Sequence, residues 1–572
     1  MMSSFLHTIA TLPPGLLMVL GALFVPFLPK MPRRIWMFGL ILASATHAWS
    51  IDYGQHLTAS FLGLDLILVR ANEFTKPFMV VFHIAAALNI IYSIHANCRT
   101  TETSGLAYAG TAVAALYAGD FATLFVYWEL TAVTSVFLIL KGGSERRLGA
   151  ALRYLLMQVV SGVLLLGGAA ALWSQGGDLT IGALDPMSLA GGLIFFAFGI
   201  KAAFPFLNGW LQDTYPEASI SGTLILSCFS TKLAIYMLVQ CFAGVEALIY
   251  IGAVMTLFPA FYAVIENDLR RVLTFSLNNQ LGFMVVGIGI GTELSLNGTA
   301  AHAFAHIIYK SVLFMAMGAV KLRTGTTKAT ELGGLWKSMP LTTIFCIVGA
   351  VSISSFPMFS GFVTKSLTIA STAQEGYLVI WFILIFASAA VLEHSGIKIP
   401  YFAFFGHDRG YKVKEAPASM LVAMGIGSLL CIVIGVFPAS VYFMLPYEVT
   451  YDVWSVGHVL GEFQLLIFAI LAFVLLMARG LYPPEIDATV LNADWLYRRL
   501  APRIIMAIFR PIWAAYQLII VGARSILFDL IRISTSSFKT TGFVSNTMSS
   551  SFAAAVFLAI FAFMLAFRFL NM

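Results

Sequence analysis

Three side chains that can hold or exchange a proton recur at every fourth position between residues 302 and 310. They are His302, His306 and Lys310, within the apolar run from Leu296 to Val320. Four residues of an α-helix advance about 400° and about 6 Å, so a helix here places all three on one stripe about 12 Å long. Imidazole ionises near neutral pH, and water can bridge gaps of this size. The spacing predicts a proton relay; two packed histidines with a lysine near an interface are the structural alternative.

Further ionisable side chains lie inside other apolar runs of the chain. Each charge at the centre of a bilayer costs about 2.5 to 3.5 kcal/mol on insertion scales, so such residues usually face a bundle interior or a hydrated cavity. Their number indicates a transport role. These residues are Glu129, Lys201, Lys232, Lys365, Glu393 and His394.

A structural role stays open for each of these groups. Glu129 could be a static ion-pair partner of a lysine, and Lys232 could likewise belong to a structural pair. The side chains of Lys201 and Lys365 could extend to a membrane surface. The last two candidates stand near the predicted end of their helix, where a solvated position is as expected as a role in transport.

The composition predicts which elements position these groups. Of 572 residues, 59% are hydrophobic and 10% are charged, and the mean hydropathy is +0.89. Soluble domains carry about 25% charged residues. Apolar runs of about 20 residues, enough to cross a bilayer, recur along the whole chain, as at 77–94, 121–140 and 551–570. We expect an all-α polytopic membrane protein with about fifteen to seventeen transmembrane helices and no soluble domain.

Two of these helices are predicted to be interrupted beside a lysine. Lys201 stands four residues before Pro205, and Pro357 and Gly361 stand shortly before Lys365. Proline removes a helical hydrogen bond, and freed backbone at membrane depth survives only inside protein or beside a hydrated cavity. The two lysines are five predicted helices apart, which predicts two inverted five-helix repeats. The expected segments are N-terminal helices (1–100), a first half-channel (104–242), a second half-channel (243–405) and C-terminal helices (415–572).

Loop charges predict the topology. Basic residues cluster after odd-numbered predicted helices, as at Arg146, Arg270 and Arg323, whereas loops after even-numbered helices are mainly acidic. By the positive-inside rule the N-terminus lies outside. The N-terminus lacks the features of a signal peptide, so the first apolar run is expected to be a retained helix. The five cysteines are scattered without a CxxC pair, so we expect no metal site and no cofactor.

Several motifs carry a family resemblance over roughly residues 75–410. They are WEL at 128–130, GIKAAFPFLNGWLQDTYPEAS from 199, STKLAIY from 230, ENDLRRVLTFSLNNQLG from 266, HAFAHIIYKSVLF from 302 and SGFVTKS from 360. They resemble the antiporter-like proton-channel subunits shared by respiratory complex I and Mrp-type Na+/H+ antiporters, and NADWLYRR at 492–499 looks most like the D-type member of the Mrp antiporters. Three residues depart from the family's pattern. Ser366 stands where the family usually has aspartate, and Asn208 stands near the position of its usual histidine. Gln280 stands where some members have histidine.

The resemblance implies a role for each residue. Glu129 and Lys201 form a modulating ion pair, Lys232 passes charge to the histidine stripe, and Lys365 ends the path. It implies a proton-translocating subunit of a multisubunit Na+/H+ antiporter in a prokaryotic cytoplasmic membrane. Its partners are other membrane subunits, protons, a monovalent cation and lipid, with no nucleic acid, metal or cofactor. The alternatives are a proton-pumping subunit of a complex I-like (NADH:quinone oxidoreductase) or membrane-bound hydrogenase complex, and a non-conducting scaffold subunit.

Overall fold

The protein is described by a computed structural model that covers residues 12–61, 63–482, 485–487, 490, 495–539 and 549–570. The chain divides into two compact units, Met1–Asn492 and Ala493–Met572. Residues 1–11 of the predicted N-terminal segment and residues 492–494 of the NADWLYRR motif lie outside the described ranges.

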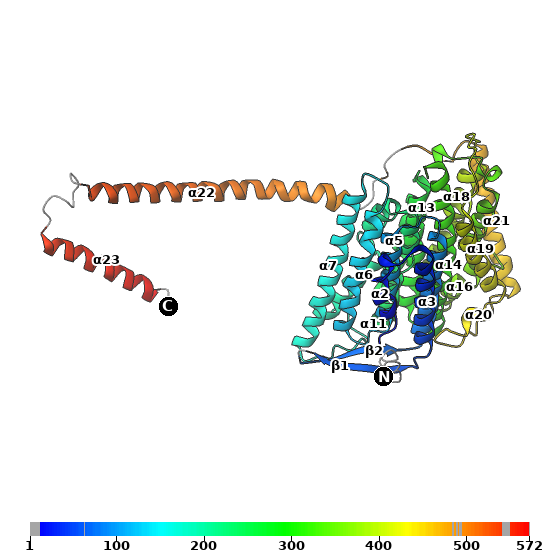
Figure 1. The fold of residues 1–572 in the computed structure, drawn as a ribbon, viewed down its shortest axis with the longest axis horizontal. Helices are drawn as coiled ribbons and strands as arrows, with labels where there is room; N and C mark the ends of the chain where they lie inside the picture. Colours follow the sequence, from blue (N-terminus) through cyan, green and yellow to red (C-terminus); the bar gives the residue numbers. More distant parts are fainter. Residues whose placement is uncertain are drawn as a thin grey trace. The chain divides into compact units, whose positions relative to one another are not determined.

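The predicted all-α polytopic class is confirmed (Figure 1). Within the described residues, 12 helices are long and apolar enough to cross a membrane, and three shorter apolar helices cover Leu16–Phe27, Leu189–Ala202 and Pro340–Ile353.

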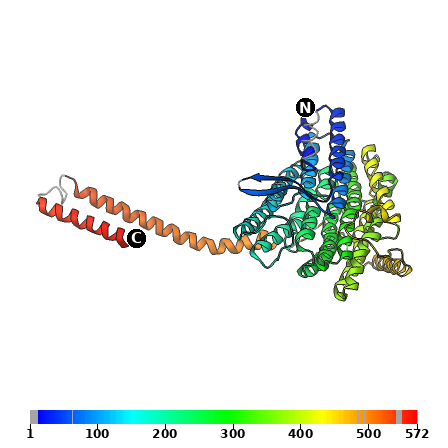
Figure 2. The ribbon, with the colours of Figure 1, turned by 90° about the horizontal axis from the view of Figure 1, so that it is seen from below.

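The first unit is a bundle of helices, which Figure 2 shows from below. Its α-helices are α2 (Leu16–Ala22), α3 (Lys30–Trp49), α4 (Thr75–Ser93), α5 (Arg99–Leu116), α6 (Phe121–Leu140), α7 (Arg147–Ser174), α8 (Leu189–Ala202), α9 (Gly209–Thr214), α10 (Ile220–Leu226), α11 (Ser230–Phe242), α12 (Ala247–Ile265), α13 (Leu269–Ile290), α14 (Glu293–Thr324), α15 (Pro340–Ile353), α16 (Ser360–Gln374), α17 (Leu378–Val391), α18 (Lys398–Pro400), α19 (Ala418–Val436), α20 (Ala439–Tyr442) and α21 (Val456–Ala478). Short 3-10 turns are η1 (Val25–Phe27), η2 (Tyr215–Glu217), η3 (Ala329–Glu331) and η4 (Leu335–Lys337), and π-helical turns are η5 (Leu392–Ile397) and η6 (Tyr401–Phe405).

The second unit consists of two long helices after a π-helical turn, η7 (Leu496–Leu500). They are α22 (Ala501–Ser537) and α23 (Ser550–Leu570), and neither has a buried residue. Both are apolar enough to span a membrane.

A β-hairpin that the sequence did not predict crosses one end of the bundle (Figure 1). Strand β1 (Gly54–Phe61) pairs antiparallel with β2 (Leu64–Ala71). The amide of Arg70 donates to the carbonyl of Tyr117 at 2.8 Å. Backbone hydrogen bonds join the loops at this end of the bundle: the amide of Leu184 donates to the carbonyl of Cys241, and the amide of Gly244 donates to the carbonyl of Ile288. We call it the hairpin end.

Asp120 joins the hairpin to α6. Its carboxylate accepts the amide of Thr123 at 2.7 Å, as a helix N-cap, and the amide of Ile67 in β2 at 2.6 Å. Asp120→Ala is expected to lower the free energy of unfolding by about 2 kcal/mol, because a cap is lost and a buried amide is left unpaired. Unfolding of the purified protein in detergent measures this. Asp178→Ala removes an exposed loop contact to the amide of Thr180 and serves as the control. An equal change in both variants would contradict the prediction.

The basic loops gather at the opposite end of the bundle. The guanidinium of Arg270 donates to the carbonyl of Pro216 at 2.9 Å, and that of Arg323 donates to the carbonyl of Glu415. Asp268 and Lys328 form an isolated β-bridge. The loop charges used to predict topology therefore lie together in space.

The two predicted helix interruptions are present. Helix α8 ends at Ala202, and Ala203 and Phe206 take positive φ angles of 62° and 67°. Helix α15 ends at Ile353 and α16 begins at Ser360, with positive φ angles at Ser355 and Met358 between them. Such angles in non-glycine residues cost about 1 to 3 kcal/mol and persist where packing enforces them.

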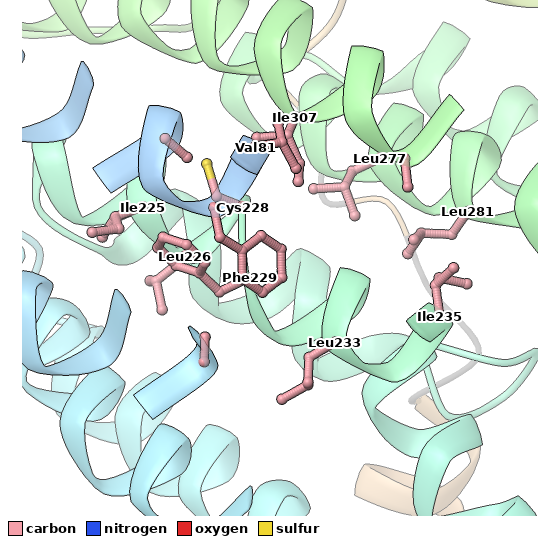
Figure 3. Packing of buried hydrophobic residues seen from close by; sticks show 14 of the residues in the cluster. Val81, Ile225, Leu226, Cys228, Phe229, Leu233, Ile235, Leu277, Leu281 and Ile307 are labelled. Atoms are coloured by element: carbon pink, nitrogen blue, oxygen red, sulfur yellow. The ribbon is translucent and has the colours of Figure 1, made fainter. Parts of the chain in front are cut away.

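A third interruption, at residues 227–229 between α10 and α11, was not predicted. Phe229 packs edge-on against the rings of Phe82 and Tyr108, at centroid distances of 5.0 and 5.2 Å. Figure 3 shows Cys228 and Phe229 among the apolar side chains that hold this break. The break precedes Lys232 by less than one helical turn.

Candidate functional site

Lys201 lies in the last turn of α8 and is fully buried. Its ammonium donates to the carbonyl of Trp128 at 2.7 Å and to the hydroxyl of Thr131 at 2.8 Å. It also stands over the Trp128 ring, 4.0 Å from the centroid. The helix interruption thus places this lysine against the middle of α6.

Glu129 lies on α6 beside this lysine, and its carboxylate faces Gly162 of α7. Glu129 and Lys201 interact electrostatically, but they are not among the salt bridges of the described residues. The predicted pair of Glu129 and Lys201 is therefore adjacent but does not form a salt bridge, since the ammonium donates to a neutral carbonyl and a hydroxyl instead. We call this arrangement the open pair.

A run of hydroxyl groups continues from Lys201 toward the break before α11. Ser135 donates to the carbonyl of Thr131 at 2.6 Å and shares a hydrogen bond of 2.7 Å with the Tyr154 hydroxyl. The Tyr154 hydroxyl also interacts with the side chain of Ser230. The Ser230 hydroxyl shares a hydrogen bond of 2.7 Å with the Tyr108 hydroxyl. Sequence reasoning missed these groups, because hydroxyls at helical spacing carry no signal of their own.

Lys232 follows Ser230 by two residues on α11 and is fully buried. Its ammonium donates to the carbonyl of Ser227 at 2.6 Å, which is freed where α10 ends. The end of a helix presents unpaired carbonyls with partial negative charge, so it is a suitable site for a cation.

The predicted stripe lies on one continuous helix, α14, and all three of its side chains are completely buried. The imidazole rings of His302 and His306 are 6.1 Å apart between centroids. The ring nitrogens of both histidines and the Nζ of Lys310 have no hydrogen-bond partner among the described protein groups. Both His306 and Lys310 interact electrostatically with Lys232. The structure therefore brings Lys232 and the stripe together.

A polar branch leaves the stripe through Tyr309. Its hydroxyl donates to the side-chain oxygen of Gln280 at 3.1 Å, and Gln280 donates to Asn279 at 2.7 Å. The side-chain amide of Asn279 donates a hydrogen bond to the carbonyl of Thr256 on α12. Gln280, which stands where some members of the family have histidine, is thus fixed by hydrogen bonds on both sides.

Lys365 sits on α16 after the second interruption and is buried. Its ammonium donates to the carbonyl of Ile353, the last residue of α15, at 3.1 Å and to the hydroxyl of Ser388 at 3.4 Å. It lies 5.2 Å from the centroid of the Phe283 ring, and that ring also neighbours His302. This arrangement links Lys365 to the start of the stripe.

Glu393 and His394, for which a solvated position and a role in transport stayed equally open, do not stand at the end of their helix. Both lie within the π-helical turn η5, and the span continues to Phe405. His394 is fully buried, with its Nδ1 2.9 Å from the Ser395 hydroxyl. Glu393 accepts a hydrogen bond of 2.6 Å from the Tyr482 hydroxyl. Gly396 allows this turn to approach Ser354 in the second interruption, where a Cβ atom would clash.

Lys398 is a buried charge that the sequence analysis overlooked. It donates to the carbonyl of Glu266 at 2.8 Å and pairs with Glu485 at 2.9 Å. The spacing of four residues from His394 was the available signal. Burial raises the pKa of Glu485, a loop residue, and the pairing with Lys398 partly offsets that rise. Asp487 pairs with Lys328 at 2.8 Å, so the segment after α21 is fixed at the opposite end.

Glu462 on α21 was also missed. It interacts electrostatically with Lys365, and both residues line one cavity of about 460 Å³.

Among the described residues there is no cluster of three or more metal-ligating side chains. The site is therefore built from ammonium, imidazole, hydroxyl and carboxylate groups in a buried array, the side-chain types that exchange protons.

A model of the family described as NADH:quinone oxidoreductase/Mrp antiporter, TM, matches residues 118–392. The D component of the Na(+)/H(+) antiporter of Alkalihalophilus pseudofirmus is 30% identical over 317 residues, which are 52% of this chain and 64% of that protein. The M component of the F(420)H(2) dehydrogenase of Methanosarcina mazei is 24% identical over 426 residues, which are 70% of this chain and 84% of that protein.

The fold also recurs in a solved structure. A chain of the membrane-bound sulfane sulfur reductase, an archaeal respiratory membrane complex, superposes with a TM-score of 0.68 and 19% sequence identity. The superposition covers 97% of this chain and 99% of that chain.

Proposed function

Because this chain belongs, through residues 118–392, to the NADH:quinone oxidoreductase/Mrp antiporter transmembrane family, we propose that it is the proton-translocating subunit of a multisubunit monovalent cation/proton antiporter. The observation that carries the proposal is the buried array from Lys201 to Lys365. Isolated charges at membrane depth are costly and are kept where they serve transport.

In the proposed path, Lys201 exchanges a proton with the hydroxyls that lead from Thr131 to Ser230. Lys232 receives charge at the start of α11, and His306, Lys310 and His302 pass it along α14. Their nitrogens lack protein partners among the described groups, which leaves them free to bind water, and bridging water is what a relay over a 6.1 Å ring spacing needs. Lys365 is the last lysine of the path.

Glu129 is proposed to set the charge state of Lys201. When the carboxylate closes on the ammonium, the charged lysine is stabilised; when it opens, as here, the proton is easier to lose. Moving one charge across about 100 mV involves about 2.3 kcal/mol, which is comparable to the change that a buried ion pair produces.

We propose that the end with the basic loops faces the cytoplasm of a prokaryote and that the hairpin end faces outward, following the positive-inside rule. The proposed partners are other membrane subunits, protons, a monovalent cation and the lipid bilayer.

The second candidate function is a proton-pumping subunit of a redox complex. It is favoured by the likeness to the F(420)H(2) dehydrogenase component, which covers 84% of that protein. In that case electron transfer in partner subunits would drive the same relay.

Affinity purification of the complex through a tag on this chain, followed by subunit identification and reconstitution into vesicles, tests the proposal. We expect proton movement driven by a monovalent-cation gradient and no electron-transfer subunits. Co-purified iron–sulfur or quinone-binding subunits, with proton movement that requires an electron donor, would replace the antiporter proposal with the redox pump.

A second prediction concerns the run of hydroxyl groups between Thr131 and Ser230. Tyr154→Phe removes one oxygen from the link between Ser135 and Ser230, so proton flux is expected to fall about tenfold, the effect of losing roughly one hydrogen bond worth 1.4 kcal/mol. Tyr117→Phe is the matched control, because its buried hydroxyl donates to the carbonyl of Ala48 away from the lysines. Flux in reconstituted vesicles measures both; equal activity of the two variants would exclude Tyr154 from the path.

A further inference from the structure

Lys365 faces a cavity that is not part of the proposed proton path from Lys201 to Lys365. The cavity has a volume of about 460 Å³ and lies between α16, α17 and α21. Its lining includes Lys365, Ser366, Trp381, His458 and Glu462.

The chain supplies a carboxylate to this cavity from α21. The residue after Lys365 is Ser366, which carries no charge, and the ammonium is not part of any salt bridge of the described residues. Glu462 is nevertheless close enough to interact electrostatically with it. A carboxylate beside a desolvated ammonium is a natural proton acceptor, because the transfer turns two charges into two neutral groups.

The groups next to Glu462 lead toward the hairpin end. His458 precedes it by four residues, so the two side chains share one face of α21. The His458 ring stacks on Phe362 at 4.6 Å, and its Nδ1 lies 2.8 Å from the carbonyl of Val453. Tyr451, in the loop before α21, packs edge-on against His458 at 5.9 Å.

The loop that carries Tyr451 belongs to the hairpin end. The amide of Tyr447 donates to Asn297, near the start of α14, and the Asn297 side chain donates back to the Tyr447 carbonyl at 2.8 Å. The Tyr447 ring also packs against Phe74, which follows β2. The polar lining of the cavity therefore runs from mid-bundle toward this end.

We propose that Glu462 accepts the proton that Lys365 releases, and that the cavity lined by Lys365, Glu462 and His458 is the outlet of the path toward the hairpin end. In this step an N–H bond of the Lys365 ammonium breaks and an O–H bond forms on the Glu462 carboxylate. A neutral amine and a neutral acid remain. Glu462 then gives the proton to water in the cavity or to His458. The inference rests on the proposed function, since it names the acceptor of the same path.

The test uses the purified complex in vesicles with six variants of this chain: the four that follow, and Lys365→Ala and Lys201→Ala. Glu462→Gln is expected to lower proton flux by at least about tenfold, because a positioned proton acceptor is lost, and Glu462→Asp is expected to retain most of the flux. The double variant S366D/E462Q places a carboxylate on α16 in the same cavity and is expected to recover flux. Asp452→Asn, an exposed acid of the same loop that does not line the cavity, is the control and is expected to leave flux unchanged.

The outcomes separate the two proposals. If Lys365→Ala abolishes flux while Glu462→Gln leaves it unchanged, the outlet is overturned and the proposed function stands. If neither Lys365→Ala nor Lys201→Ala changes flux in an assembled complex, the proposed function itself fails. Should Glu462→Gln prevent assembly, S366D/E462Q decides, because a complex that assembles without recovering flux overturns the role of the carboxylate.

Discussion

Lys201→Ala is expected to lower proton flux by about 100-fold or more, the range in which a positioned proton donor contributes, while the complex still assembles. The ammonium is the only basic group in hydrogen-bonding contact with α6 at this depth among the described residues. Without this ammonium, no proton-exchanging group of the described residues connects Glu129 to the hydroxyl groups that begin at Thr131. Thr131 and Trp128 keep a mutual hydrogen bond of 2.7 Å, so α6 is not left with an unpaired hydroxyl.

Proton flux in vesicles and the subunit composition of the purified complex measure this result. Lys141→Ala is the matched control, since this exposed lysine caps the end of the same helix and lies outside the path. Unchanged flux in an assembled Lys201→Ala complex would instead favour the scaffold role, in which the chain supports its partners without conducting.

Lys310→Met is expected to abolish proton flux and at the same time to stabilise the protein. The Nζ of Lys310 is fully buried without a hydrogen-bond partner among the described groups. Burying an unpaired ammonium costs free energy that a methionine of similar length does not. We expect a gain of about 1 kcal/mol or more in the free energy of unfolding, and a fall in flux of at least about 100-fold.

Thermal unfolding in detergent and flux in vesicles are read on the same preparation. Lys412→Met, at an exposed lysine in the loop before α19, is the control and is expected to change neither quantity. A Lys310→Met protein that is less stable than the wild type would show that the ammonium has a structural partner, which would remove it from the relay.

The sequence predicted those parts of the site whose signal is local. His302, His306 and Lys310 could be placed on one stripe because they share one helix, and two interruptions were marked by Pro205 and Pro357. The break before Lys232 contains neither proline nor glycine. It is held by Phe229 and its aromatic neighbours, which is a tertiary effect that no local pattern records.

Long-range partners could not be predicted for the same reason. Glu462 is a single acid in an apolar run, and only the packing of α21 against α16 places it near Lys365. Lys398 finds its acid, Glu485, 87 residues further along the chain. The β-hairpin was missed because its two strands, of 8 residues each, lie between much stronger helical signals.

The carbonyl contacts of three buried lysines have a consequence for electroneutrality. Lys201, Lys232 and Lys365 each donate to a backbone carbonyl, those of Trp128, Ser227 and Ile353. A carbonyl is neutral, so the loss of the lysine proton leaves no anion at the group that accepts this hydrogen bond. A lysine clamped to a carboxylate would leave an uncompensated buried charge, which costs about 3 to 5 kcal/mol. Lys232, whose carbonyl partner lies at a helix interruption and which has no carboxylate among its interaction partners in the described part of the chain, can therefore gain and lose a single charge without the movement of a counter-charge.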